Sequence, residues 1–379
     1  MNLNGTSSST AQSSGFKPDN HSPLSKDEKT SSARVSSPAL RERLQQLKPG
    51  TTGQPGKITG SFQSLHHQPQ ESTVKLVSEI PKPYAVEAPP PNDIGQKIQL
   101  AIDAEIAAFP YHRSLDKISQ ATQLPENHTK VDPEVGKHLN FGQWDIARPL
   151  ALAAGNAAGL STKGSEGFIY DKKSGLTAYI LHNPTSDPKP EVRLVFGGTT
   201  SGKATGGLVK RSLSNRGFTL RQWIANAKNA LLGKAPDSYK QASELTQKVQ
   251  SLMAADPKYK DYAFSVSGHS KGGGEAAYAA LSQKEPVHAI CFSSAELGRE
   301  MRESIPEERK ANAAAHVQHY YIEGDAVPNM SDNLLIRKAG GKIEHIGKVT
   351  TLPADNEASN SLDRHDKFTR HIHYFAKSG

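Results

Sequence analysis

The most informative nine residues of the chain are Phe264-Ser-Val-Ser-Gly-His-Ser-Lys-Gly272. They hold the pattern Gly268-x-Ser270-x-Gly272 between an apolar run that predicts a strand and a small-residue run, Gly272-Gly-Gly-Glu-Ala-Ala, that predicts a closely packed helix. A serine at such a sharp turn is held in a strained conformation, and flanking glycines let neighbouring chains approach. The helix N-terminus also favours developing negative charge at the serine. We therefore predict a nucleophile elbow with Ser270 as nucleophile.

Strands alternate with helices on both sides of this turn. Helical patterns cover 94–109, 145–160, 218–233, 237–256, 272–283 and 365–375, and strand patterns cover 167–171, 176–184, 191–196, 262–268, 287–295, 317–325 and 342–349. The strands at 167–171 and 176–184 are joined by turn residues and predict a hairpin. The other alternations imply βαβ units, so we expect an α/β sandwich with a mainly parallel sheet covered on both faces.

The N-terminal residues differ in composition from the rest of the chain. Residues 1–95 hold 11 of the 24 Pro and 15 Ser, but only three aromatic residues. Such a segment buries too little apolar surface to offset its ordering entropy, so we expect a disordered region over 1–95 and a folded domain over 96–379. The proline-rich segment 81–93 is expected to be an extended linker. Leucines 40, 44 and 47 predict either a partner-docking amphipathic helix or a transient one.

No stretch reaches 18 uninterrupted apolar residues, and the first thirty residues lack the apolar region of a cleavable secretory signal. We therefore expect neither a membrane span nor Sec-dependent export. Cys291 is the single cysteine, so an intramolecular disulfide is excluded and no cysteine cluster exists for zinc or an iron–sulfur centre. No metal or organic cofactor is expected.

A serine nucleophile needs a histidine base and an orienting acid, in the chain order Ser, Asp, His for this fold. Asp325 follows the predicted strand and a glycine, and it is the candidate acid. Glu323 is the fallback, although it lies inside the predicted strand.

Four histidines follow both Ser270 and Asp325 in the chain, and each is a candidate base. His345 falls in a predicted strand, and His371 and His373 are expected to pack the last helix, with His371 the second choice. His365 lies where a loop enters the final predicted helix, which is the position expected for the base.

The oxyanion hole requires two backbone amides near the serine. One is expected from Lys271, the residue after the nucleophile. The strand 191–196 runs into Gly197-Gly-Thr-Thr, where glycines let the backbone turn its amides inward, and Thr199 is expected to supply the second amide.

Four motifs together resemble the lipase class 3 family of α/β-hydrolases, including its bacterial Mbeg1-like branch. They are Phe-Gly-Gly-Thr at 196–199, Gly-His-Ser-Lys-Gly at 268–272, Gly-Asp-Ala-Val-Pro at 324–328 and a histidine near the C-terminus. The first is similar to that family's Phe-Arg-Gly-Thr oxyanion loop, with Gly197 in place of Arg. The resemblance covers about residues 140–379. It implies an α/β-hydrolase fold and lipase or phospholipase activity on acyl lipids, with Ser270, Asp325 and His365 as triad.

The folded part carries most of the positive charge. Residues 1–95 contain 10 Lys+Arg and 8 Asp+Glu, which leaves 36 and 30 for the remainder out of the chain's 46 and 38. The cations concentrate at 203–221, and no nucleic-acid motif accompanies them, so nucleic acid is not an expected partner. This basic segment is expected to contact anionic lipid, or to form a lid over the site. Its candidate lipid-binding residues are Lys203, Lys210, Arg211 and Arg216.

Two other functions compete with an acyl hydrolase. The run Gly197-Gly-Thr-Thr-Ser-Gly-Lys-Ala resembles a P-loop, but its last position is Ala204 and offers no hydroxyl to Mg²⁺, which argues against nucleotide binding. A catalytically weak or inactive module of the same fold could instead bind phosphoinositides or a host protein, and the sequence leaves that alternative open.

A Ser- and Pro-rich N-terminus ahead of a lipase-like domain resembles the type III-secreted effectors of Gram-negative pathogens. That resemblance implies that residues 1–95 carry an export signal and contact a secretion chaperone or host protein. It also implies virulence-related action on membrane lipids in the host cytoplasm or at a membrane surface. A cytosolic bacterial protein with a disordered arm is the alternative.

Overall fold

One sheet of ten strands organises the part of the chain that the computed structural model describes, residues 84–122, 141–198, 201, 236–327, 345–355 and 360–377. In spatial order its strands are β1 (Ala85–Glu87), β10 (Gly347–Leu352), β9 (Val317–Ile322), β8 (His288–Phe292), β7 (Ala263–His269), β6 (Glu191–Phe196), β5 (Thr177–Asn183), β4 (Phe168–Tyr170) and β3 (Ser161–Lys163), with β2 (Asp145–Ile146) beside β5. Along this order, every pair of neighbours from β1 through β10, β9, β8 and β7 to β6 is parallel. The pairs among β2, β3, β4, β5 and β6 are antiparallel, and the pair of β4 with β5 is the predicted hairpin.

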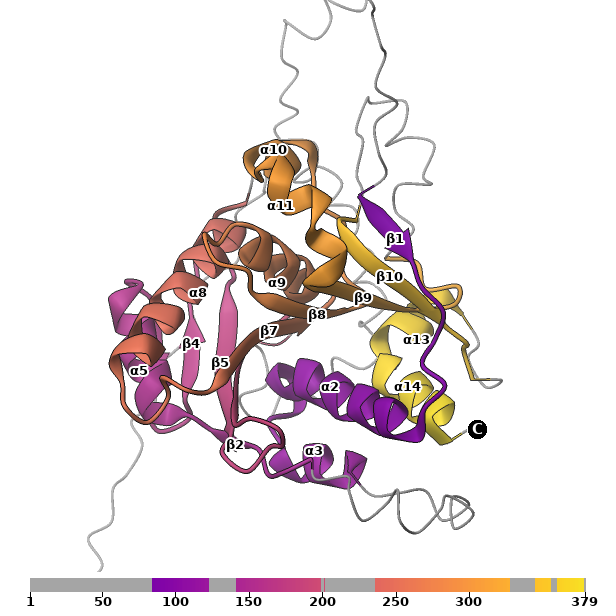
Figure 1. Ribbon diagram of the computed structural model, residues 1–379, viewed down its shortest axis with the longest axis horizontal. Coiled ribbons are helices and arrows are strands. Elements are labelled where there is room, and N and C mark those ends of the chain that lie inside the picture. Colours follow the sequence, from indigo (N-terminus) through magenta and orange to yellow (C-terminus); the bar gives the residue numbers. More distant parts are fainter. Residues whose placement is uncertain are drawn as a thin grey trace, which may run out of the picture. The chain divides into compact units, whose positions relative to one another are not determined.

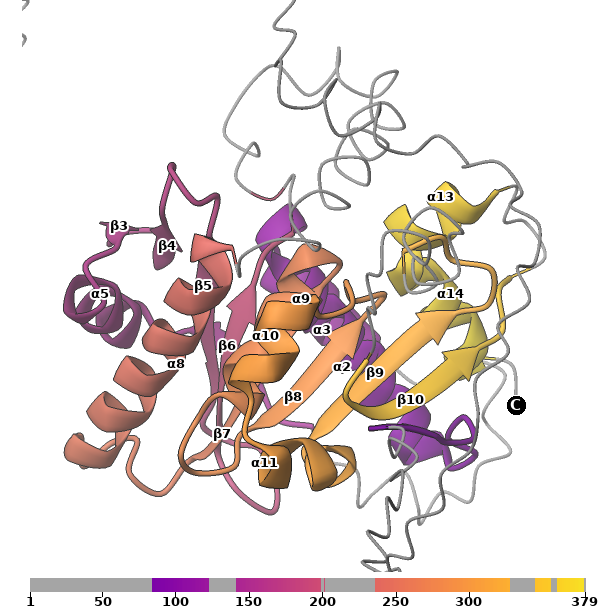
Figure 2. The same ribbon diagram turned by 90° about the horizontal axis from the view of Figure 1, so that it is seen from above.

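Helices cover both faces of the sheet, as Figures 1 and 2 show. One face carries α5 (Arg148–Ala157), α8 (Asp237–Ala255), α9 (Lys271–Leu281), α10 (Arg299–Ser304), α11 (Glu307–Ala311) and the short η4 (Ala313–Ala315). The other carries α2 (Ile94–His112), α3 (Leu115–Ala121), α13 (Ser361–Asp366) and α14 (Phe368–Lys377). The expected α/β architecture, a mostly parallel sheet between helices, is confirmed.

The side chains of the central strands are apolar on both faces of the sheet, which explains why a layer of helices covers each face. On β5, Ala178 and Ile180 pack into the core beneath α5, α8 and α9, whereas Tyr179 and Leu181 pack into the core beneath α2 and α14. Successive side chains of a strand point to opposite faces, so a strand that is apolar at every position requires cover on both. No helix of the described ranges is long and apolar enough to cross a membrane.

Four details differ from the sequence-based expectations. The segment expected to be a helix at 145–160 begins with the strand β2, so the helix α5 covers only its middle part. The predicted linker contains β1, whose backbone pairs with β10 even though its sequence is flanked by prolines. His345 lies two residues before β10, so it is not in the strand. The predicted final helix is two helices, because Lys367 leaves helical geometry between α13 and α14 (φ −107°, ψ 28°). The amphipathic helix predicted from leucines 40, 44 and 47 and the helix predicted at 218–233 lie outside the described residues.

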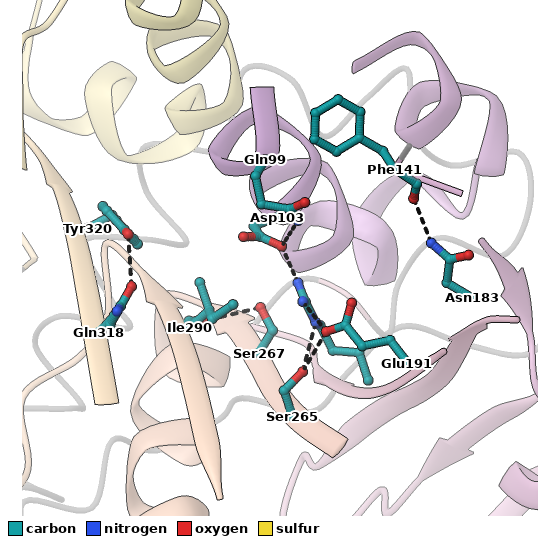
Figure 3. A network of polar contacts seen from close by, with 11 residues as sticks. Gln99, Asp103, Phe141, Asn183, Glu191, Ser265, Ser267, Ile290, Gln318 and Tyr320 are labelled. Carbon is teal, nitrogen blue, oxygen red and sulfur yellow. Dashed lines mark hydrogen bonds and ion pairs between the residues drawn. The ribbon is translucent and has the colours of Figure 1, made fainter. Parts of the chain in front are cut away.

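A buried ionic cluster ties α2 to the middle of the sheet. Arg193 on β6 is 2% exposed; it pairs with Asp103 of α2 and, at 2.7 Å, with Glu191, and it donates to the Ser265 hydroxyl at 3.0 Å. Figure 3 shows Asp103 pointing from the helix toward Glu191 and Ser265 on the strands. A buried charge without its partner is costly, so this cluster fixes where α2 sits on the sheet.

Candidate active site

Ser270 lies at a strained turn between β7 and α9. Its backbone angles are φ 59° and ψ −126°, a region that residues other than glycine rarely adopt. Two hydrogen bonds to the end of β8 and the residues after it hold this turn. The Ser270 amide donates to the Phe292 carbonyl, and the Ala295 amide donates to the Ser270 carbonyl, both at 3.0 Å. The serine has the backbone geometry predicted for a nucleophile elbow.

The flanking glycines are required by close backbone contacts. A Cβ at Gly268 would lie 2.4 Å from the carbonyl carbon and oxygen of Gly272, and a Cβ at Gly272 would lie 2.3 Å from the Phe196 carbonyl oxygen. Real Cβ atoms do not approach backbone that closely, so α9 reaches its position against β6 and β7 only because these positions lack side chains.

Asp325 and His365 are in direct contact. Asp325 follows β9 in a tight turn, where its Oδ1 accepts from the Val327 amide at 2.9 Å. His365 Nδ1 lies 3.1 Å from both carboxylate oxygens, and both side chains are almost completely buried. Because Nδ1 faces the carboxylate, Nε2 is the nitrogen left to act as a base.

The other candidate residues have different partners. His345 pairs with Glu296 at 3.7 Å, His371 Nδ1 accepts from the Asp355 amide at 3.0 Å, and His373 Nε2 lies 2.8 Å from Glu105. His371 and His373 thus pack the last helix, as expected. The fallback acid, Glu323, has an exposed side chain. Of the four histidines, the structure brings His365 to the acid.

His269 connects the elbow to the segment that carries His365. The two imidazole rings lie with centroids 4.5 Å apart, and His269 Nε2 donates to the His365 carbonyl at 3.0 Å. The His269 ring also stacks on Phe368 at 4.0 Å with an interplanar angle of 4°. His365 therefore lies at the same sheet edge as Ser270, beyond the carboxyl ends of β7 and β9.

The loop after β6 has Gly197 and Gly198 at the place expected for the oxyanion loop. The Gly198 amide donates to the Tyr111 hydroxyl at 3.1 Å, and the Ser201 hydroxyl donates to the Gly198 carbonyl at 2.6 Å. A Cβ at Gly197 would lie 2.3 Å from Ser201 Oγ and 2.4 Å from Thr177 Oγ1, so no side chain fits where the resembled family has Arg. Thr199 lies outside the described residues.

Lys271 begins α9 directly after Ser270, which places its amide at the helix N-terminus. Its ammonium pairs with buried Glu275 and donates to the Gly175 carbonyl at 3.3 Å. Burial raises the pKa of Glu275, and the Lys271 ammonium opposes that rise. The side chain is thus held along α9, and the backbone amide is the group of Lys271 suited to receive negative charge.

The candidate lipid-binding residues Lys203, Lys210, Arg211 and Arg216 lie outside the described residues. Among the residues that are described, no group of three or more His, Cys, Asp or Glu side chains could hold a metal ion. Sequence reasoning missed Tyr111, Thr177 and Ser201. His269 stands inside the elbow motif and could have been noticed there, but Tyr111 belongs to no motif.

The sequence from 149 to 364 matches the family model described as "Phospholipase-like: Tle-like phospholipase domain". Ser270 and Asp325 lie inside the matched range, and His365 follows it directly. No curated protein matches the chain. Among solved structures, the crystal structure of dienelactone hydrolase from Anabaena variabilis ATCC 29413 matches with 12% identity and a TM-score of 0.22. That match covers 37% of this chain and spans 62% of the other chain.

Proposed function

Since this chain belongs to the Tle-like phospholipase domain family, we propose that it hydrolyses an acyl ester bond of glycerophospholipids with Ser270 as nucleophile. The observation that carries the proposal is the buried contact of Asp325 with His365 at the sheet edge where Ser270 occupies its strained turn. A serine, an imidazole and a carboxylate in this chain order are the groups that acyl transfer needs.

The proposed reaction proceeds in two steps. His365 Nε2 takes the Ser270 proton while Oγ attacks the ester carbonyl carbon, and the amides of Lys271 and Thr199 receive the charge that develops on the carbonyl oxygen. Collapse of this intermediate releases the alcohol, which takes the proton from His365 and leaves an acyl-serine. Water, deprotonated by His365, then releases the fatty acid and restores Ser270. Asp325 holds the imidazolium throughout.

The substrate would be presented by a membrane. We assign Lys203, Lys210, Arg211 and Arg216, which follow the oxyanion loop in sequence, to contact with anionic head groups. On this assignment, alanine at all four positions lowers binding to anionic vesicles while hydrolysis of a short soluble ester is retained.

We also propose that the enzyme acts on host membranes after export through a non-Sec, type III route, with residues 1–95 carrying the signal. The support is the Ser- and Pro-rich composition of that region. Export from a type III-competent bacterium should be lost when residues 1–95 are deleted and should persist when those residues are fused to a reporter. A reporter that stays in the cell would overturn the route.

The test is fatty-acid release from mixed phospholipid and galactolipid vesicles by the wild type and by Ser270→Ala at equal folded concentration. We expect release by the wild type and a loss of at least about 1,000-fold in the variant. Equal release by both would overturn Ser270 as nucleophile. Vesicle binding by both with no release of any acyl chain would favour a lipid-binding module of the same fold.

A further inference from the structure

We propose that Tyr111 and His269 are positioning residues, which together hold the oxyanion loop and the His365 segment in one fixed relation. The inference rests on the proposed function, because it assigns a role in that same site. Four parts of the chain meet at these two side chains: the last turn of α2, the loop after β6 at Gly198, the end of β7 and the helix α13.

The hydrogen bonds form one continuous chain with a fixed direction. A carbonyl can only accept, so His269 Nε2 carries the proton that it donates to the His365 carbonyl at 3.0 Å. In a neutral ring, Nδ1 must then accept, and it accepts from the Tyr111 hydroxyl at 3.0 Å. The same hydroxyl oxygen accepts from the Gly198 amide at 3.1 Å. The chain thus runs from the Gly198 amide to the His365 carbonyl.

Burial favours this single arrangement of protons. His269 is 4% exposed, and burial, together with the neighbouring His365, holds its pKa well below the usual range for histidine. Burial also raises the pKa of Tyr111, so the hydroxyl keeps its proton. Both groups are therefore neutral throughout the range in which a histidine base would work.

Packing supports the same role independently of the hydrogen bonds. The His269 ring is stacked on Phe368 and lies beside the His365 ring, so it cannot rotate without displacing both. On the other side, a Cβ at Gly198 would lie 2.0 Å from the Tyr111 hydroxyl oxygen. Glycine at 198 is thus required for the contact between the oxyanion loop and Tyr111.

The hydrogen-bonded chain sets the position of the oxyanion loop relative to the proposed base, His365. One end of the hydrogen-bonded chain fixes the loop that precedes the Thr199 amide, and the other end fixes the backbone of the proposed base. Displacing a reacting group by about 1 Å can cost about 100-fold in rate without loss of binding. Neither Tyr111 nor His269 needs to touch the substrate for its loss to slow the reaction.

The first test is Tyr111→Phe, assayed by fatty-acid release from phospholipid vesicles. We expect kcat to fall about 10- to 100-fold while KM changes by less than about 3-fold, with the protein still folded. Tyr278→Phe is the control, because it also removes a tyrosine hydroxyl, but one that hydrogen-bonds to Ser304 at 3.1 Å and joins neither Gly198 nor His269. The control should keep wild-type kcat. Wild-type kcat in Tyr111→Phe would overturn the proposal.

The second test compares His269→Gln with His269→Leu and combines each with Tyr111→Phe. Glutamine can still donate to the His365 carbonyl, so it should retain at least about 5-fold more activity than leucine. If the two residues act as one chain, the double variant Tyr111→Phe/His269→Leu will be no slower than the slower single variant. Losses that multiply, or equal kcat in the glutamine and leucine variants, would overturn the proposal.

These outcomes are distinguishable from failure of the proposed function. If the wild type releases no fatty acid, or Ser270→Ala releases as much as the wild type, the hydrolase assignment fails and the positioning role fails with it. If the wild type is active and Ser270→Ala is not, the effects of Tyr111→Phe and of the His269 variants judge the positioning role alone.

Discussion

His365 Nδ1 lies 3.1 Å from each carboxylate oxygen of Asp325, and each of the two residues is 1% exposed. The pair joins the turn after β9 to the short helix α13, forty residues later in the chain. Burial removes competing water, so the carboxylate both orients the ring and stabilises a positive charge that forms on it.

Asp325→Asn should lower kcat by about 1,000- to 10,000-fold, because the amide can hold the imidazole in the wrong tautomer and cannot stabilise the imidazolium. The measurement is kcat for fatty-acid release. Asp355→Asn is the control, since Asp355 is also buried and lies 3.5 Å from a histidine, His371. Its loss should be under about 10-fold, and equal losses in both variants would argue that the Asp325 effect is structural.

Gly272→Ala should destabilise the protein by about 1–3 kcal/mol and lower kcat, because its Cβ would meet the Phe196 carbonyl oxygen at 2.3 Å. The elbow or the oxyanion loop must move to make room. Urea unfolding and kcat are the two measurements. Gly164→Ala, whose Cβ would be 3.9 Å from Leu152, should change the free energy of unfolding by less than about 0.5 kcal/mol. Similar values for the two variants would contradict the close packing of the elbow.

Glu105 on α2 should make stability depend on pH in the acid range. Burial opposes ionisation of this carboxyl, but its pairing with His112 at 3.2 Å and with His373 at 2.8 Å lowers its pKa from 4.5 to about 2. Between those values the unfolded chain binds a proton that the folded chain does not. The stabilisation is therefore complete above about pH 4.5 and is lost as the pH falls toward about 2.

Urea unfolding of the wild type and of Glu105→Gln at pH 7 and pH 3 checks this. We expect the variant to be less stable by ~3 kcal/mol at pH 7, and the difference to shrink at pH 3. A difference that is the same at both pH values would show that the charge of Glu105 does not contribute.

Much of this fold could be predicted from local patterns. The strand expected at 191–196 is β6 with the same bounds, and the helix expected at 237–256 is α8 but for its last residue. These segments carry strong periodicity, and their neighbours in the sheet follow from the alternation of strands and helices. The strand β1 gave no such signal, because three residues between prolines form a strand only through pairing with β10.

The candidate site could be predicted where its residues belong to sequence motifs that occur in the chain order Ser, Asp, His. Ser270, Asp325 and His365 each follow a predicted strand or begin a predicted helix, and the structure brings Asp325 and His365 into contact. Tyr111 could not be found in this way. It is 158 residues from His269, and nothing in its local sequence shows that α2 ends beside the elbow.

Covalent labelling with a fluorophosphonate, located by peptide mass spectrometry, directly tests whether Ser270 is an activated nucleophile. Such a probe loses fluoride when an activated serine oxygen attacks its phosphorus. We expect one label per chain, on Ser270, and labelling slowed at least about 100-fold in His365→Gln. Labelling on another serine, or equally fast labelling of Ser270 in His365→Gln, would contradict that assignment.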